Sequence, residues 1–419
     1  AEQKQTVKAD SKGYWEVNLK ALETGGPYQL QIIGKENPIS IKDILIGDVW
    51  LCSGQSNMQW VVNNVTNAEV EKKNANYPQI RTLNIPRRME LSPKDTISAT
   101  WLVCSPETVG RFSGVAYFFA RKVYEETNIP IGIINSSWGG TIVETWTSLE
   151  AANTLPQKRL DRYNKNEKLF PPTEYLTRKN KEAKRNDYPS LVYNAMIHPL
   201  LSFSIKGVLW YQGENNVGNA EPYTDWLTCM IGDWRNRWNS ELPFYIIQLP
   251  NFDSINKKPL WAEMRDAQSK VLAVPGTHLI VTSDLGDPYD LHPRNKQEVG
   301  MRAALQALHY EYGYSDIVSE SPMFERMEIN GDKVIITFKN TGSGLEIRSR
   351  YGCLQGFAIA GEDKKFHWAL GELKDNRIVI WSPKVPNPVA VRYNWENNPD
   401  GNLYNKDGLP ACLFRTDNW

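Results

Sequence analysis

A serine that could act as a nucleophile lies directly after an apolar stretch near residue 50. Ser56 stands two residues after Gly54 in Leu51–Met58 (LCSGQSNM), where the end of a predicted strand can direct its hydroxyl into a cleft. Met58 takes the place of the second glycine in a G-x-S-x-G elbow, so this turn is of another kind. A Ser/Gly turn that caps a helix explains these residues equally well.

Two other predicted strands also end in small and polar residues, in Asn135–Thr141 (NSSWGGT) and Trp210–Asn216 (WYQGENN). Consecutive glycines allow backbone N–H groups to turn toward a ligand, as an oxyanion hole requires. Side-chain amides in the second segment can donate to a developing oxyanion, and Glu214 could order them. Each segment taken alone is also typical of an ordinary turn.

Few residues are candidates for a histidine general base, because the chain has only five histidines. His278 begins a predicted strand, His309 lies in a predicted helix and His367 lies in a β-rich tail, so we expect structural roles for them. His198 could line a pocket. His292 lies in a loop rich in glycine and proline, between the last strand of an alternating α/β region and a helix. That position suits a catalytic base.

The loop before His292 carries carboxylates two, five and eight residues upstream, the nearest of which is Asp290. A carboxylate that accepts a hydrogen bond from one imidazole nitrogen leaves the other nitrogen to take a proton from serine. Residues i and i+2 of an extended segment point to the same side, so Asp290 can reach His292. A structural ion pair is the alternative for this histidine, but together with a serine at a strand end a triad is favoured.

Composition excludes several classes of function. The 419 residues include 48 Lys+Arg and 48 Asp+Glu, and this zero net charge argues against nucleic-acid binding. Apolar runs fall short of the about 20 residues that span a bilayer. The 15 tryptophans could stack on the flat faces of sugars, or they could fill the core of the protein. Without a Cys/His cluster, structural zinc is not expected, and the pairing of the five cysteines stays open: Cys52, Cys104, Cys229, Cys353 and Cys412.

From about residue 44 to residue 314, short apolar runs alternate with longer segments of helical spacing. This rhythm predicts βαβ units and a parallel sheet covered on both faces, with the active site beyond the carboxyl ends of the strands. The predicted strands are Val49–Cys52, Ile131–Asn135, Gly207–Tyr211, Phe244–Leu249 and His278–Ser283. The predicted helices are Val115–Glu126, Tyr223–Trp238, Pro259–Ala273 and Lys296–Tyr312.

The remaining segments suggest three units: residues 1–46, 47–316 and 317–419. The first contains two predicted strands, Tyr14–Leu19 and Tyr28–Ile33, which we expect to belong to an accessory β domain. Residues 150–190 are polar and predict a surface excursion beside a cleft. The last unit is β-rich, with predicted strands at Lys333–Lys339, Gly356–Ile359, Arg377–Trp381 and Val389–Tyr393.

Together these segments resemble the sialate O-acetylesterase family of the SGNH-hydrolase superfamily, in the order and nearly over the length of that family. The matching blocks are Gly47–Met58, Ser137–Thr141, Trp210–Asn216, Asp290–Pro293, Val391–Trp395 and Gly408–Asp417. The resemblance implies a flavodoxin-like, three-layer αβα parallel sheet of the SGNH type with a β-rich accessory domain. Two departures are Asn215, where the family usually has serine, and the short N-terminal β segment.

The resemblance implies a carbohydrate O-acetylesterase in which Ser56 attacks the acetyl carbonyl, His292 is the base and Asp290 orients it. The oxyanion would be held by the N–H groups of Ser56 and Gly139, with Gly140 as the alternative glycine and the Gln212 side chain as a further donor. The donor role of Asn216 is less secure, because of the change at the preceding residue. No metal or organic cofactor is implied.

The family points to O-acetylated sialic acid as the substrate, with acetylated xylan or another polysaccharide as the alternative. Arg111 and Arg294 flank the motifs and are candidates to clamp the sugar carboxylate. A catalytically silent carbohydrate-binding protein stays open as a third interpretation. The chain begins at Ala1 without a leader pattern, so we expect a removed signal and a periplasmic, extracellular or lysosomal location. The sequence predicts no oligomeric state.

Overall fold

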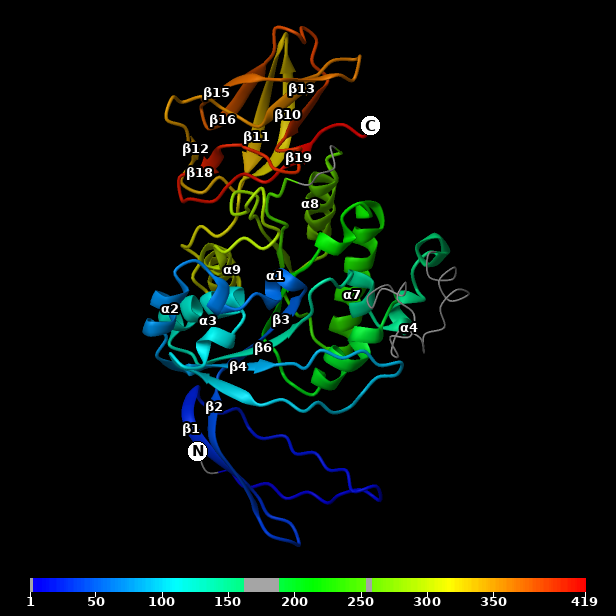
Figure 1. Cartoon of the computed structure of the whole chain (residues 1–419), viewed down its shortest axis with the longest axis vertical. Coiled ribbons are helices and arrows are strands. Elements are labelled where there is room, and N and C mark those ends of the chain that lie inside the picture. Colours follow the sequence, from blue (N-terminus) through cyan, green and yellow to red (C-terminus); the bar gives the residue numbers. More distant parts are fainter. Residues whose placement is uncertain (1–2, 162–187, 254–257) are drawn as a thin grey trace.

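The computed structural model describes residues 3–161, 188–253 and 258–419. Three regions follow one another along its longest axis (Figure 1). A β-hairpin lies at one end, an α/β body occupies the middle, and a region of β-strands lies at the other end. The middle of the predicted excursion at 150–190 falls outside the described residues.

The α/β body is built on a seven-stranded sheet in the order β5-β4-β6-β3-β7-β8-β9. All neighbouring strands from β4 to β9 are parallel, and β5 is antiparallel to β4. All five predicted strands of this region are confirmed, whereas β4 and β5 were not predicted. The strands are β3 (Asp48–Gly54), β4 (Tyr77–Asn84), β5 (Trp101–Cys104), β6 (Ile131–Ser137), β7 (Gly207–Tyr211), β8 (Phe244–Ile247) and β9 (Thr277–Ile280).

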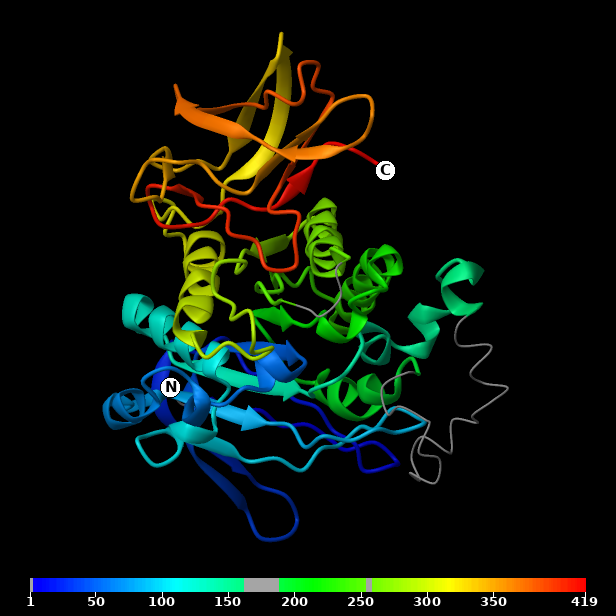
Figure 2. The same cartoon turned by 45° about the horizontal axis from the view of Figure 1, so that its top comes forward.

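Helices cover both faces of this sheet. The side chains of a strand alternate between the two faces, so each face presents side chains for helices to pack against. In β3, the buried Trp50 and Cys52 pack in one core with α3 and α9, while Leu51 packs in the other core with α7 and α8. Figure 2 shows these layers from a second angle. The four predicted helices correspond to α3 (Gly114–Thr127), α7 (Ala220–Trp238), α8 (Leu260–Lys270) and α9 (Lys296–Glu311). No helix in the described ranges combines the length and hydropathy of a membrane span.

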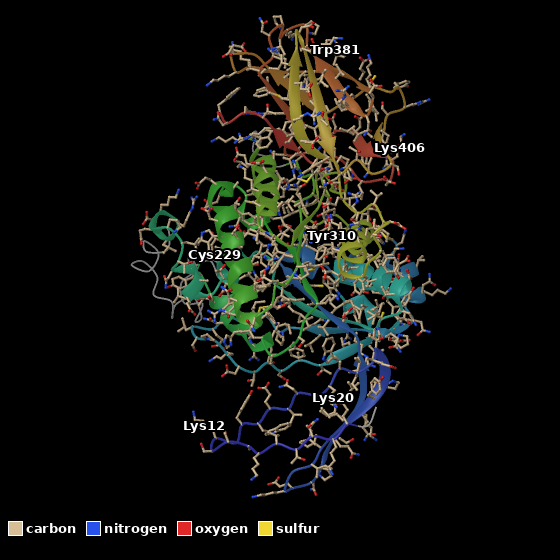
Figure 3. All side chains as sticks on the ribbon, turned by 180° about the vertical axis from the view of Figure 1, so that it is seen from behind. Lys12, Lys20, Cys229, Tyr310, Trp381 and Lys406 are labelled. Atoms are coloured by element: carbon tan, nitrogen blue, oxygen red, sulfur yellow. The ribbon has the colours of Figure 1, made fainter. Side chains whose placement is uncertain are left out.

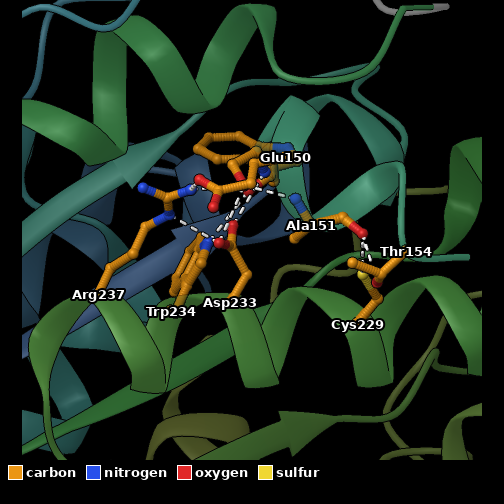
Figure 4. Close-up of polar contacts among 9 residues, drawn as sticks. Glu150, Ala151, Thr154, Cys229, Asp233, Trp234 and Arg237 are labelled. Carbon is orange, nitrogen blue, oxygen red and sulfur yellow. Dashed lines mark hydrogen bonds and ion pairs between the residues drawn. The ribbon is translucent and has the colours of Figure 1, made fainter.

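The segment after β6 is fastened to α7 by a group of polar contacts (Figure 4). The Asp233 carboxylate accepts from the backbone N–H of Ser148 (2.9 Å) and from the guanidinium of Arg237 (2.7 Å). Arg237 also pairs with Glu150 at 2.8 Å, on the short helix α4 (Leu149–Ala152). These bonds fix the chain that leaves the glycine-containing segment at the end of β6.

The N-terminal strands do not join the C-terminal strands, so that expectation is wrong. β1 (Gly25–Ile32) and β2 (Ile39–Ile46) pair only with each other in the described structure, as an antiparallel hairpin. Arg81 of β4 pairs with Asp43 at 2.8 Å and attaches the hairpin to the α/β body. The predicted strand at Tyr14–Leu19 is not a strand. In the described part of the chain, this segment has no neighbouring strand with which to pair.

The C-terminal β region, strands β10 to β19, contains two four-stranded antiparallel sheets around one apolar core. Seen from behind, its residues Trp381 and Lys406 lie at the opposite end of the molecule from Lys12 and Lys20 (Figure 3). The four predicted strands are confirmed. The strands are β10 (Met323–Asn330), β11 (Lys333–Lys339), β12 (Leu345–Ile347), β13 (Phe357–Ala360), β14 (Phe366–Trp368), β15 (Leu370–Lys374), β16 (Arg377–Trp381), β17 (Ala390–Tyr393), β18 (Leu403–Asn405) and β19 (Phe414–Arg415).

The C-terminal β region touches the loops that follow β8 and β9. Asn251 donates a side-chain hydrogen bond to Asn398 (2.7 Å) and accepts one from the backbone N–H of Gly286 (2.6 Å). Tyr404 donates to the carboxylate of Asp284 at 3.2 Å. The C-terminal β region therefore holds the loop between β9 and α9, which carries His292, directly through Tyr404 and indirectly through Asn251.

Candidate active site

Three neighbouring strands at the centre of the sheet, β6, β3 and β7, end beside one another and bring the three predicted blocks together. The backbone N–H of Trp138 donates to the carbonyl of Gly54 at 2.9 Å, and that of Gln55 donates to the carbonyl of Tyr211 at 2.9 Å. The side-chain oxygen of Gln55 also lies 3.3 Å from the backbone nitrogen of Gly213. The first block is therefore hydrogen-bonded to both of the others.

Ser56 is placed at the sheet edge by a sharp turn after β3. Gly54 has φ +136°, and a Cβ atom there would lie 2.1 Å from the carbonyl oxygen of Tyr211, so only glycine fits. The turn leads into the short helix α1 (Ser56–Gln59), which Ser56 begins. The serine side chain is partly buried. Its N–H belongs to the first turn, where backbone donors lack partners within the helix.

Gly139, a predicted oxyanion donor, lies against the serine. A Cβ atom at Gly139 would be 3.2 Å from the Cβ of Ser56. Its N–H donates to the side-chain oxygen of Gln59 at 2.8 Å, so in this structure Gln59 occupies the donor. The neighbouring Gly140 has φ +77°, and its carbonyl accepts from the side chain of Asn215 at 2.9 Å. A substrate oxygen must displace Gln59 before the Gly139 donor can serve it.

The side-chain amides of Gln212 and Asn216, predicted as oxyanion donors, make hydrogen bonds within the strand-end loops in this structure. The fully buried Gln212 amide nitrogen lies within hydrogen-bond distance of Asn216 Oδ1 (2.7 Å) and the Thr141 carbonyl (3.0 Å). The Asn216 amide donates to Glu144 at 2.9 Å. A buried amide must satisfy its donors, and these bonds link the strand-end loops.

His292 is far from Ser56 in the sequence, yet the loop that carries it contacts the segment of Ser56. The side-chain amide of Asn57, which follows Ser56, donates to the carbonyl of Leu291, which precedes His292, at 3.1 Å. The imidazole stacks on Trp60, with centroids 4.9 Å apart and 8° between the planes. Its Nε2 is enclosed and has no hydrogen-bond partner among the described residues. The predicted serine and histidine segments therefore meet.

Asp290 accepts a hydrogen bond from the backbone N–H of His292 at 2.8 Å, through its Oδ1. This bond fixes the carboxylate beside the histidine, and its charge raises the pKa of the imidazole. Burial and the charge of Lys296 act in the opposite direction and outweigh it, so the pKa of His292 is lowered from its ordinary value. The neutral, base-competent form of the ring is favoured.

The lowered pKa predicts how the activity depends on acidity. A base must be unprotonated to accept a proton, so kcat/KM should rise with pH as His292 loses its proton. We expect the midpoint of this rise below about 6.5, the ordinary value for histidine. A pH profile of kcat/KM for a simple acetyl ester measures it. A midpoint well above that value would contradict the environment described for His292.

Four neighbours of the candidate site were not predicted from the sequence. Asn57 belongs to the same block as Ser56, Gln59 and Trp60 follow that block directly, and their closeness in sequence was the available signal. Lys296, which begins α9, is fully buried. No pattern could have indicated this, because lysines are almost never fully buried unless paired.

The two candidate arginines are exposed. Arg111 ends a short 3₁₀ turn before α3, and Arg294 lies two residues after His292. In the described ranges, no group of three or more His, Cys, Asp or Glu side chains is arranged to hold a metal ion.

Comparison with protein families identifies a family that matches this chain. Residues 46–309, which include all the blocks of the candidate site, match the family model of the carbohydrate esterases described as sialic acid-specific acetylesterases. The chain belongs to this family. Among curated proteins of similar sequence, the human sialate O-acetylesterase is 33% identical over 369 residues, which is 79% of this chain and 66% of the human protein. The chain thus spans slightly less than two thirds of that relative. The mouse sialate O-acetylesterase is 31% identical over 92% of this chain and 80% of its own length.

Among solved structures, this chain is similar to a carbohydrate acetylesterase from Xanthomonas citri. It superposes with a TM-score of 0.88 and 39% identity, over 99% of this chain and 90% of its own. The predicted fold, an αβα parallel sheet with a β-rich region, is therefore confirmed, and so is the resemblance to the family.

Proposed function

We propose that this chain is a serine esterase that removes O-acetyl groups from sugars. The observation that carries the proposal is the bond between the Asn57 side chain and the Leu291 carbonyl, which joins the residue after Ser56 to the residue before His292. A pure binding protein has no need of a serine whose segment is hydrogen-bonded to one that carries a partly buried histidine and a carboxylate. Membership of an esterase family supports the same conclusion.

The reaction would proceed through an acetyl-enzyme. The Oγ of Ser56 attacks the acetyl carbonyl carbon while its proton passes to Nε2 of His292. The tetrahedral intermediate breaks the bond to the sugar oxygen, which takes that proton and leaves as a hydroxyl. Water then gives a proton to the same histidine as it attacks the acetyl-serine. The second tetrahedral intermediate breaks the bond to Ser56 Oγ, which takes this proton back from the histidine, and acetic acid is released. Asp290 stabilises the imidazolium formed in each half of the reaction.

We place the oxyanion between the backbone N–H groups of Ser56 and Gly139. The first belongs to the unpartnered start of α1, and the second becomes available when the carbonyl oxygen of the substrate replaces that of Gln59. Both donors are backbone N–H groups, one at the start of α1 and one in the turn after β6, as an oxyanion hole requires.

The substrate we propose is O-acetylated sialic acid, after the curated relatives that are named sialate O-acetylesterases. The carboxylate of this sugar could be bound by Arg111 or Arg294, which are exposed beside the motif segments. Acetylated xylan is the alternative, and the Xanthomonas relative is described more broadly as a carbohydrate acetylesterase. A glycan substrate favours a periplasmic, extracellular or lysosomal location.

Acetate release distinguishes these substrates. We expect faster release, per enzyme and at equal acetyl concentration, from 9-O-acetylated sialic acid than from acetylated xylan. The Ser56→Ala variant provides the blank for spontaneous hydrolysis. Release from xylan alone would keep the esterase and replace the substrate. Release from neither substrate, and none from p-nitrophenyl acetate, would remove the proposed function.

A further inference from the structure

A lysine that the proposed mechanism does not use is buried directly behind the candidate site. Lys296 is 0% exposed at the start of α9. Gly114, the first residue of α3, closes over its stem, since a Cβ there would lie 3.2 Å from the Cβ of Lys296. The ammonium lies 5.4 Å from the centre of the Tyr211 ring and donates to the side-chain oxygen of Asn57 at 2.5 Å.

The amide of Asn57 receives this bond and makes two more with its nitrogen. It donates to the carboxylate of Glu214, in the third block, and to the carbonyl of Leu291 at 3.1 Å. One fully buried amide thus connects the helix of Ser56, the end of β7, the loop of His292 and the start of α9. The oxygen of this amide is fixed by Lys296, which therefore determines where its nitrogen points.

Lys296 and Glu214 form a charged pair on either side of this amide. An unpaired buried charge is costly, so each group requires the other. Burial nevertheless lowers the pKa of Lys296 to about 7, against the charges of Glu214 and Asp290, which raise it. Burial likewise raises the pKa of Glu214, against Asn57 and Lys296. The charge of Lys296 therefore changes near neutral pH, unlike that of an ordinary lysine.

We propose that Lys296 is a positioning residue for the esterase reaction: through Asn57 it holds the Ser56 helix and the His292 loop in register, with Glu214 as its counter-ion. The inference rests on the proposed function. Its charge also favours the neutral form of His292, on which Lys296 and Asp290 act in opposite directions. Lys296 does not touch the substrate, so its loss should lower kcat far more than it changes KM.

The groups that face Lys296 determine how the reaction should depend on pH. They are Glu214 and Tyr211 from the third block, Asn57 from α1, and Asp290 and His292 from the loop; α3 contributes the uncharged Gly114. As pH rises through neutrality, Lys296 loses its charge and Glu214 loses its counter-ion. The activity of the unchanged protein should therefore fall on the alkaline side, in addition to the acidic fall caused by His292.

Replacing the lysine by an uncharged side chain of similar length tests the inference. For Lys296→Met with p-nitrophenyl acetate, corrected for spontaneous hydrolysis, we expect kcat to fall about 10²-fold, the cost of a misplacement near 1 Å. The acidic midpoint of kcat/KM should move to higher pH, because a charge that lowers the pKa of His292 is gone, and the alkaline fall should disappear. Lys270→Met is the matched control, since that lysine is exposed at the end of α8. It should leave the profile unchanged.

Glu214→Gln provides the second variant, because it keeps the shape and the acceptor for Asn57. Removing this negative charge lowers the pKa of Lys296, so the alkaline fall should move to lower pH. If Lys296→Met does not fold, as judged by its melting curve, the Glu214→Gln profile decides. Profiles of the unchanged shape in folded variants would overturn the inference while leaving the esterase intact. An unchanged protein that hydrolyses no acetyl ester would remove the proposed function and this inference with it.

Discussion

Ser56→Ala should reduce hydrolysis of p-nitrophenyl acetate by about 10⁴–10⁶-fold, the loss expected when a nucleophile that acts together with a base is removed. The reason is chemical rather than structural. The Oγ atom is the only atom at this position that can form the acetyl ester, and water held nearby is a far poorer nucleophile. Initial rates at saturating ester, compared with the unchanged protein, measure the effect.

Stability and a matched serine provide the controls for this variant. Ser56→Ala removes one oxygen from a partly buried side chain at the start of α1, so the melting temperature should stay nearly the same. Ser53 lies three residues upstream in β3, and its buried hydroxyl has no hydrogen-bond partner among the described residues. Ser53→Ala should keep its activity. Full activity in Ser56→Ala would eliminate Ser56 as the nucleophile.

Asp290→Asn should lower kcat by about 10²–10⁴-fold, since a triad carboxylate replaced by an amide loses its charge while keeping its shape. Asparagine can still accept the hydrogen bond from the backbone N–H of His292, so the loop should keep its conformation. Only the charge that stabilises the imidazolium is lost. Because that charge raises the pKa of His292, its removal should also move the acidic midpoint of kcat/KM to lower pH.

Asp287→Asn is the control for this experiment. Asp287 is exposed in the same loop, and its carboxylate accepts from the backbone N–H of Tyr289 at 2.8 Å, a bond that asparagine can also make. We expect its activity to stay within a few-fold of the unchanged protein. If Asp287→Asn loses activity and Asp290→Asn does not, the orienting carboxylate has been assigned to the wrong residue.

The central strands and the long helices were predictable because their burial leaves a pattern in the sequence. β3, β6 and β7 are short apolar runs, and α7 repeats a tryptophan or methionine at every fourth residue. β4 could not be recognised in the same way. Its residues (YPQIRTLN) mix polar side chains with a proline, and they form a strand because a neighbouring strand is present on each side.

Residues of the candidate site could be predicted where they come directly after a strand. Ser56, Gly139 and His292 were found because each follows a strand that had been recognised, and the structure brings their segments together. The role of the Gln212 amide stays a prediction. Sequence shows that an amide is present but not which way it points, and here the interior of the loops takes its donors. Lys296 was missed because its burial depends on the approach of a separate helix.

The hydrogen bonds of Asn398 with the loop after β8 and of Tyr404 with the loop after β9 bear on how much of the chain an active enzyme requires. A fragment cut before β10 would retain every side chain of the proposed chemistry, yet the loop that bears the imidazole would lose its outer scaffold. We therefore expect this fragment to lose activity although it keeps the sheet and its helices. On heating, we expect activity to be lost as soon as either the α/β body or the C-terminal β region unfolds.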